Sequence, residues 1–133
     1  MSEPKDPRPT DAELQLLKIL WERGPSTVRE VHEALNQPKP TMYTTVLKTL
    51  QIMAEKGLVR RDENQRAHVY EAAIERESTQ RKLVFDLLDR VFDGSARQLV
   101  LHALSSRRAS STELAEIRKF LDDVEANQKG KSS

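Results

Sequence analysis

The sequence predicts a mainly α-helical fold, in which three short helices and a β-hairpin are followed by three further helices. Two observations predict this class. Apolar side chains recur at intervals of three and four residues along most of the chain, which is the spacing of one face of a helix. This spacing is interrupted once, over residues 58–71, by two short strand-like runs around a polar turn. A chain of 133 residues is long enough for one ordinary domain or two small ones.

The composition excludes several classes of protein. The chain has no cysteine, which excludes a disulfide framework, a thiolate nucleophile and any metal site built on sulfur. Its 22 basic and 21 acidic residues nearly cancel, so a site for a polyanion must be local. No run reaches the roughly 18 apolar residues of a membrane span, and the first residues lack the apolar segment of a secretion signal. We therefore expect a cytoplasmic protein without membrane insertion.

The first two helices are predicted from their N-terminal caps. Thr10 and Glu13 have the spacing of a capping box, and Gly24 with the following proline ends the first helix. Its apolar face consists of Leu14, Leu17 and Trp21. Ser26 or Thr27 opens a second helix of about ten residues, with Glu30 three positions after Thr27 as in a capping box. Residues 1–9, which hold three of the six prolines, are expected to form a disordered leader.

The third helix is predicted over residues 41–56, with Gly57 as its C-terminal stop. Its apolar stripe consists of Tyr43, Val46, Leu47, Leu50, Met53 and Ala54. Residues 37–54 form a run of eighteen without an acid, whereas an even spread of the 21 acids would put two or three there. The outward positions are Thr41, Thr44, Thr45, Lys48 and Gln51. Such side chains can meet base edges and phosphates, although threonines can also simply cover a solvated face.

Residues 58–62 and 67–71 are expected to form a hairpin, which completes the element order of a winged helix-turn-helix. Arg60, Arg61 and Arg66 flank its tip with His68, where cations can contact a sugar-phosphate backbone. A charged hairpin that is merely solvated is an equal alternative. We assign residues 10–73 to this DNA-binding domain.

Residues 74–125 return to the helical pattern, with a predicted cap at Ser95 and a predicted capping box of Ser110 with Glu113. The apolar positions expected to mediate dimerisation are Leu83, Leu87, Val91, Phe92, Leu99, Leu114, Ile117 and Leu121. A segment of about this length supports only a marginal core by itself, which favours burial against a second copy. Packing onto the first domain in a monomer is the alternative. Residues 126–133 lack apolar character and are predicted to form a disordered tail.

The sequence gives little support for catalysis. His32, His68 and His102 lie on separate elements without a metal-binding spacing, and no nucleophile or phosphate-loop motif occurs. We predict no catalytic site, no metal site and no cofactor. The acidic set Asp86, Asp89 and Asp93 can bind a cation weakly or pair with Arg90 and Arg97, but it fits a solvated or partner-facing stripe better.

Four runs carry a likeness to a known family: AELQLLKILW from Ala12, TVREV from Thr27, YTTVL from Tyr43 and EKGLV from Glu55. Together with the FDGS run from Phe92, they resemble the BlaI/MecI/CopY family of bacterial repressors over roughly residues 10–124. The resemblance implies a homodimer whose winged helices bind a palindromic double-stranded DNA operator. It also implies repression of genes for β-lactam resistance or metal handling.

The resemblance further implies particular residues. The family inserts the start of its third helix into the major groove, which corresponds here to Thr41, Met42, Tyr43, Thr44, Thr45 and Lys48. In the β-lactam branch a membrane-bound sensor protease triggers cleavage in the dimerisation region, and the matching bond joins His102 and Ala103. The family's best-known cleaved bond joins asparagine to phenylalanine. Ile52 lies on the outer side of the third helix, where relatives usually carry a polar or basic residue. The copper switch of the third branch requires cysteines, which the chain lacks.

Two other functions remain open from the sequence. A winged-helix module can bind protein instead of DNA, and a regulator of this shape can hold a small molecule in its helical region. An enzyme is the weakest option.

Overall fold

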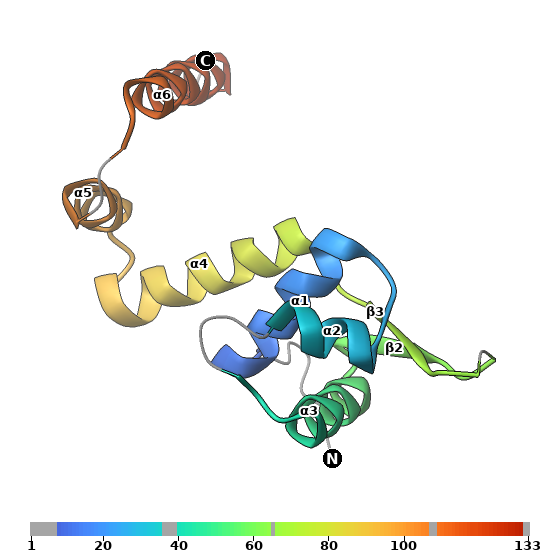
Figure 1. Ribbon diagram of the computed structural model, residues 1–133. Coiled ribbons are helices and arrows are strands. Elements are labelled where there is room, and N and C mark those ends of the chain that lie inside the picture. Colours follow the sequence, from blue (N-terminus) through green and yellow to red (C-terminus); the bar gives the residue numbers. More distant parts are fainter. Residues whose placement is uncertain (1–7, 36–39, 65, 107–108, 132–133) are drawn as a thin grey trace. The chain divides into compact units, whose positions relative to one another are not determined.

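The computed structural model describes residues 8–35, 40–64, 66–106 and 109–131 of the chain. The chain divides into two compact units, Met1–Phe85 and Asp86–Ser133 (Figure 1). Helices dominate both units, and the first also contains a small antiparallel sheet. The predicted fold class, mainly α with an N-terminal winged helix-turn-helix, is confirmed.

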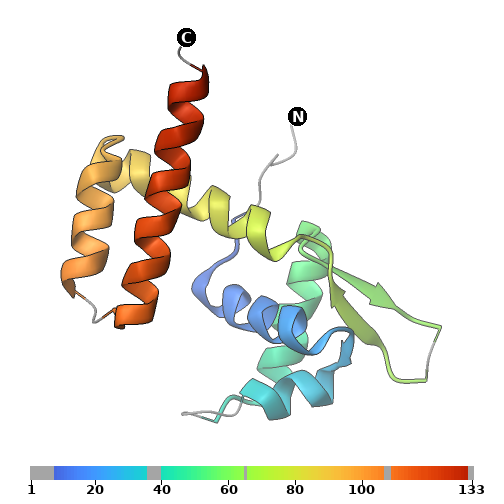
Figure 2. The same cartoon turned by 90° about the horizontal axis from the view of Figure 1, so that it is seen from above.

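The first unit contains the three predicted helices and the hairpin. The helices are α1 (Asp11–Arg23), α2 (Val28–Leu35) and α3 (Tyr43–Lys56), and the strands are β1 (Ser26–Thr27), β2 (Val59–Asp62) and β3 (Val69–Ala72). The hairpin of β2 and β3 extends away from the three helices in both views (Figures 1 and 2). The predicted turn between α2 and α3 lies largely outside the described residues, as do residues 1–7 of the predicted leader.

The capping boxes predicted at Thr10 and Thr27 are present, and at Ser110 the Glu113 amide donates to the Ser110 hydroxyl oxygen at 3.0 Å. Thr10 Oγ1 accepts from the Glu13 amide at 3.2 Å, while Glu13 Oε1 accepts from the Thr10 amide at 2.9 Å. The same reciprocal bonds join Thr27 and Glu30. The second helix is described over eight residues, Val28–Leu35, and Ser26 and Thr27 just before it pair with β3 as strand β1. At the end of α3, Gly57 adopts the left-handed conformation with φ of 85° that glycine accepts without strain.

The sheet has the strand order β1-β3-β2 and is antiparallel throughout. The predicted hairpin is confirmed, with Arg60 opposite Glu71 and Asp62 opposite Val69. The third strand, β1, was not predicted, because two residues are too few to show the alternation of a strand. It carries Ser26 directly opposite Tyr70, which is buried in the core.

One hydrophobic core holds the first unit together. Its buried side chains are Leu16, Leu17, Leu20, Val28, Val31, Val46, Leu50, Met53, Leu58, Val59 and Tyr70. Trp21 packs against this core, as the sequence indicated, and its Nε1 donates to the carbonyl oxygen of Ile74 at 2.9 Å. Tyr43, by contrast, was placed on the apolar stripe but is 46% exposed, because the first turn of α3 projects beyond the core. Burial of α3 therefore begins at Val46.

The second group of helices is α4 (Arg76–Phe92), α5 (Ala96–Ser106) and α6 (Ser111–Lys131). The unit boundary falls within α4 between Phe85 and Asp86, twelve residues after the boundary expected at 73/74. The start of α4 belongs to the first unit because Thr79 is buried there and the Arg76 guanidinium lies 5.9 Å from the Trp21 ring centroid.

The last helix is longer than expected. Residues 126–131 were predicted to be a disordered tail, but α6 continues through them to Lys131. The run Glu125, Ala126, Asn127, Gln128, Lys129 contains mostly good helix formers, so an existing helix can extend without an apolar face. None of the described helices is both long and apolar enough to cross a membrane.

Candidate nucleic-acid interface

The exposed face of α3 gathers the side chains that the sequence singled out. Met42 is 70% exposed, and Thr44, Thr45, Lys48 and Gln51 are exposed on the helix after it. Thr41 is half-buried. The opposite face is fixed in the core by Val46, Leu50 and Met53. From Thr44 to Gln51 the exposed face carries hydroxyl and amide groups and one ammonium, so this part can donate and accept hydrogen bonds, and the first carboxylate on the helix is that of Glu55.

Two contacts hold the ends of α3. At its start, His32 Nε2 donates to the Thr41 carbonyl oxygen at 2.6 Å, and the His32 ring meets the Tyr43 ring edge-on at 5.8 Å. No side-chain bond caps the helix at Met42, which makes the His32 contact the local anchor. From the sequence, His32 was weighed only as a catalytic or metal-binding residue, and this role was not predicted. Its position in the last turn of α2, before a short turn, was the available signal.

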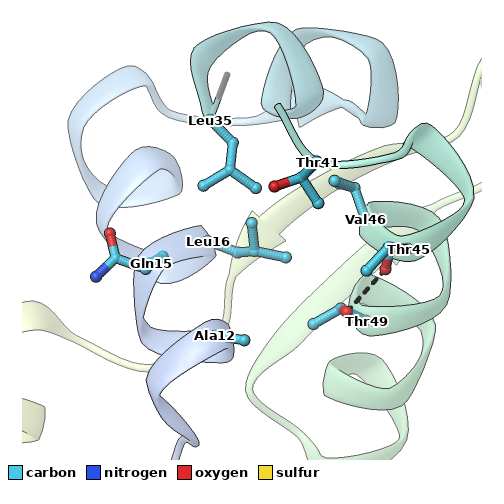
Figure 3. A pocket seen from close by; sticks show the side chains of 8 residues that line it. All are labelled: Ala12, Gln15, Leu16, Leu35, Thr41, Thr45, Val46 and Thr49. Carbon is cyan, nitrogen blue, oxygen red and sulfur yellow. Dashed lines mark hydrogen bonds between the residues drawn. The ribbon is translucent and has the colours of Figure 1, made fainter. Parts of the chain in front are cut away.

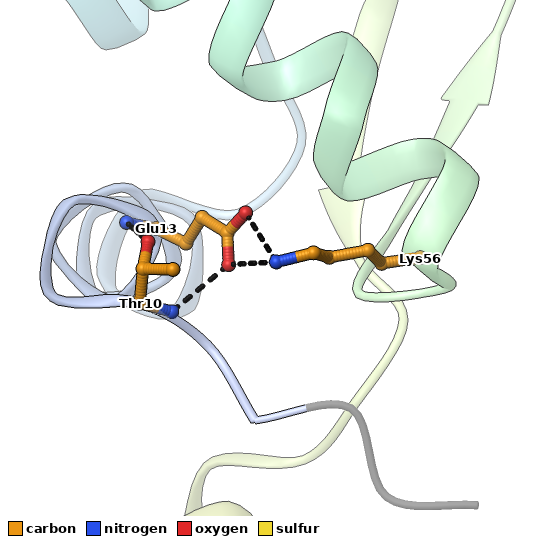
Figure 4. A network of polar contacts seen from close by, with 3 residues as sticks. All are labelled: Thr10, Glu13 and Lys56. Atoms are coloured by element: carbon orange, nitrogen blue, oxygen red, sulfur yellow. Dashed lines mark hydrogen bonds and ion pairs between the residues drawn. The ribbon is translucent and has the colours of Figure 1, made fainter. Parts of the chain in front are cut away.

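At the end of α3, Lys56 forms an ion pair with Glu13 of α1 (Figure 4). Burial raises the pKa of the Glu13 carboxyl, but the hydrogen bonds from Lys56 and Thr10 outweigh it, so the pKa lies below its ordinary value. Glu13 is almost fully buried with this partner, and the carboxylate also belongs to the α1 capping box. One acidic side chain therefore joins the beginning of α1 to the end of the exposed helix.

The three arginines and the histidine predicted for the hairpin differ in their surroundings. Arg60 Nε lies 3.6 Å from Glu71 Oε1, and Arg61 pairs with Glu63. Hydrogen bonds to Tyr70 and then Glu63 raise the pKa of Arg61. Arg66 and His68 are exposed, and neither has an ion-pair partner in the described part of the chain. The sequence could not separate these two groups because pairing depends on strand register.

A groove of about 550 Å³ lies between α2, the start of α3 and the hairpin. We call it the α2–hairpin groove, and it is lined by Thr27, Val28, Arg29, Tyr43, Leu47, Arg66, Ala67, His68 and Tyr70. Arg29 was not among the predicted contact residues. Arg29 lines this groove because the hairpin folds beside α2, which the sequence does not predict.

A second pocket, of about 180 Å³, separates α1 from the first half of α3 (Figure 3). It is lined by Ala12, Gln15, Leu16, Leu35, Thr41, Thr45, Val46 and Thr49. The Thr49 hydroxyl donates to the Thr45 carbonyl and is thus already satisfied. The volume is below the roughly 300 Å³ at which small-molecule sites usually begin. This pocket therefore offers little support for the small-molecule alternative.

The helices of the second unit carry many exposed apolar side chains. Among the predicted dimerisation residues, Leu87, Val91 and Leu121 are exposed. The others, Leu83, Phe92, Leu99, Leu114 and Ile117, are half-buried, and Leu83 falls within the first unit. Phe120 is 65% exposed, and no residue described from Asp86 onward is fully buried. A chain with this much apolar surface in water is expected to cover it.

His102 and Ala103, the bond suggested for cleavage, lie inside α5 and are exposed. The His102 ring stacks at a tilt on Phe92, with 5.6 Å between centroids. Within the described residues no three histidine, aspartate or glutamate side chains gather as a metal site. Asp86, from the predicted acidic stripe, pairs with Arg90 at 2.8 Å, which is one of the pairings that the sequence offered.

Comparison with known proteins adds to this geometry. A family model described as penicillinase repressor matches residues 9–123. The chain belongs to the penicillinase repressor family. The resemblance drawn from the sequence runs is thus confirmed, and the family is one of repressors, not enzymes.

The chain is also similar to individual members of the penicillinase repressor family. The transcriptional regulator BlaI of Mycobacterium tuberculosis is 36% identical over 118 residues, covering 87% of this chain and 84% of its own. The penicillinase repressor of Bacillus licheniformis is 24% identical over 94% of this chain and 98% of its own. The solution structure of the DNA binding domain of the repressor BlaI has a TM-score of 0.50 and 28% identity, covering 56% of this chain and 90% of that structure.

Proposed function

We propose that this penicillinase repressor family member is a transcriptional repressor that binds a palindromic DNA operator as a homodimer. The observation that carries the proposal is the exposed face of α3 from Tyr43 to Ala54, which carries no acid, beside a hairpin that holds exposed arginines. The family membership and the likeness to the DNA binding domain of BlaI support it independently.

In this proposal the first half of α3 enters the major groove, whose width of about 12 Å admits a helix. Thr44 and Thr45 present hydroxyls and methyls to base edges, and Lys48 pairs with a phosphate or a guanine edge. Thr41, Met42 and Tyr43 lie at the leading end, where a recognition helix makes most of its contacts. Ile52 is 39% exposed and lies one turn after Lys48, too far along the helix to join the residues at its leading end. Its proposed role is an apolar contact at the edge of the interface.

The hairpin acts as a wing that lies over the sugar-phosphate backbone. Arg66 and His68 are available for this contact, whereas Arg60 and Arg61 must exchange an acidic partner for a phosphate. Such exposed pairs are worth only about 0–1 kcal/mol, so the exchange is feasible. The exchange leaves the carboxylates of Glu71 and Glu63 near the DNA, however, and their repulsion of the phosphates reduces the gain in binding free energy.

Dimerisation follows from the apolar surface of α4, α5 and α6. Exposed side chains such as Val91, Phe120 and Leu121 cost free energy in water, and a second copy can cover them. Linking two winged helices makes the second half-site contact intramolecular, which raises the overall affinity by orders of magnitude. Loss of the dimer then releases the operator.

Release by proteolysis is the corresponding regulatory step, with a membrane-bound sensor protease acting at His102 and Ala103. Both residues lie inside α5, so the helix must open locally before a protease can bind an extended strand. The regulated genes would serve β-lactam resistance or a related stress response. Intact-mass analysis of the repressor from induced cells should then reveal fragments that end at His102 and begin at Ala103. Fragments cut elsewhere would assign a different scissile bond.

The test of the whole proposal is footprinting of the purified full chain on the DNA flanking its own gene, repeated across a salt series. We expect protection of a two-fold symmetric site and a steep loss of affinity with salt. Absent or salt-insensitive binding to all DNA would favour the protein-interaction alternative instead.

A further inference from the structure

The two edges of α3 meet the hairpin in opposite electrostatic surroundings. The α2–hairpin groove beside the start of α3 contains two arginines, Arg29 and Arg66, and no acid. A second groove, of about 490 Å³, lies beside the later part of α3 and contains Arg61 together with Glu55 and Glu63. The first groove thus has a formal charge of +2 and the second a formal charge of −1. Only the first is suited to an anion.

We propose that Arg29, Arg66 and His68 together hold one phosphodiester of the DNA backbone in the α2–hairpin groove. We call these three residues the phosphate clamp. Arg29 comes from α2, while Arg66 and His68 come from the hairpin, so the clamp exists only in the folded unit. The inference rests on the proposed DNA binding and adds a contact residue, Arg29, outside the recognition helix and the wing. It assigns Arg60 and Arg61 a smaller share of the backbone contact.

The hydrogen-bonding chemistry of the groove supports a phosphodiester as its ligand. Arginine has five N–H donors and no acceptor, and it matches the paired oxygens of a phosphate. No carboxylate lines this groove, and of its two guanidinium groups only that of Arg29 has an acidic partner in the described residues, Glu33, which lies outside the groove. The phosphodiester is the group of DNA that offers two charged acceptor oxygens.

Arg29 is free to turn toward such a ligand. Its side chain is 83% exposed, and its Nε lies 3.7 Å from the Glu33 carboxylate, which is itself 68% exposed. A pair of this kind contributes little because water competes for both groups. The nearest acid of the capping box, Glu30, is engaged by the Thr27 amide and does not line the groove.

Tyr43, at the start of α3, lines this groove and precedes Thr44 along the helix. The edge of its ring rests on His32, which also bonds to the Thr41 carbonyl, so the ring is supported from α2. A strand whose phosphate lies in the groove would pass beside this ring before its bases meet Thr44. The clamp thereby sets the register in which the helix reads the bases.

The test uses the full chain with Arg29→Ala and, as a matched control, Arg81→Ala, which removes an exposed arginine of α4. Operator binding is measured at several salt concentrations. Each phosphate contact accounts for roughly threefold of the affinity lost between about 50 and 200 mM salt. Arg29→Ala and Arg66→Ala should each reduce the salt slope by about one, and Arg60→Ala should reduce it by less.

A chemical probe identifies the phosphate itself. Operators with a single neutral methylphosphonate are bound by the parent chain and by Arg29→Ala. One position should weaken the parent but leave the affinity of Arg29→Ala unchanged. Because Arg29 is exposed, its variant should keep the parental melting temperature.

The outcomes distinguish a failure of the proposed DNA binding from a failure of the proposed phosphate contact. If the parent chain shows no salt-dependent DNA binding, the proposed function fails. If the parent binds but Arg29→Ala matches Arg81→Ala in slope and in methylphosphonate sensitivity, DNA binding stands and the clamp is overturned.

Discussion

The ammonium of Lys56 lies 2.9 Å from each carboxylate oxygen of Glu13, across forty-three positions of the sequence. The same carboxylate closes the capping box with Thr10, as Figure 4 shows. Glu13 is nearly buried, whereas the Lys56 side chain is 34% exposed. This unequal burial means that the lysine can be hydrated alone but the carboxylate cannot, which determines how the pair responds to mutation.

Replacing Lys56 with methionine should therefore destabilise the protein at neutral pH. The substitution keeps much of the side-chain volume but leaves a buried carboxylate without its cation, at a cost of about 1–3 kcal/mol. Chemical denaturation at pH 7 measures the loss. Lys18→Met, at an exposed position of α1, provides the matched control and should change stability by less than about 0.5 kcal/mol.

The same pair predicts a dependence on pH. In the parent chain the pKa of Glu13 is lowered from its ordinary value of 4.5, so its contribution is present above pH 4.5 and is lost as the pH falls below that value. The stability difference between the parent and Lys56→Met should shrink over this range, because protonated Glu13 no longer needs the cation. Melting temperatures at pH 7 and at stepwise lower pH measure the difference, and a constant gap would contradict the assignment.

Lys48→Ala should weaken operator binding and lower the salt slope by about one if the ammonium contacts a phosphate. Lys48 is exposed on α3 and pairs with no acid in the described residues, so removing it should leave folding intact. Lys18→Ala controls for the loss of one positive charge. A lowered affinity with an unchanged slope would assign Lys48 to a base and not to the backbone.

His32→Phe should lower DNA affinity several-fold while costing about 1 kcal/mol of stability. Phenylalanine keeps a ring against Tyr43 but cannot donate to the Thr41 carbonyl, so the approach to α3 loses its anchor. Thermal unfolding and operator binding are measured together. Equal losses in His32→Phe and His32→Ala would assign the effect to the hydrogen bond, and full activity of both variants would refute the anchoring role.

Leu121→Asp should convert the proposed dimer to monomer and lower operator affinity by about 100-fold or more. Leu121 is 55% exposed in the structure, so a charge there is costly only if a second copy covers it. Sedimentation velocity measures the assembly. Asn127→Asp adds the same charge at an exposed polar position of α6 and should remain dimeric. If Leu121→Asp sediments like the parent, dimerisation through this surface is wrong.

The sequence was sufficient for features that depend on neighbours along the chain. The capping boxes of Thr10 and Thr27, the stop at Gly57 and the hairpin depend on residues a few positions apart, and all are present. The absence of acids from residues 37–54 is likewise evident from the sequence alone. The end of α6 was missed because the expected tail was judged by its lack of apolar residues, whereas helix propensity alone sustains an existing helix.

What only the tertiary structure decided are relationships between distant segments. Strand β1 exists because Ser26 meets Tyr70, and the bond between Lys56 and Glu13 joins two helices. Strand register pairs Arg60 with Glu71. The folding of the hairpin beside α2 places Arg66 and Arg29 in the lining of the same groove. The physical reason is that propensity and capping act through local hydrogen bonds, while the surroundings of a surface charge depend on which elements the core packs together.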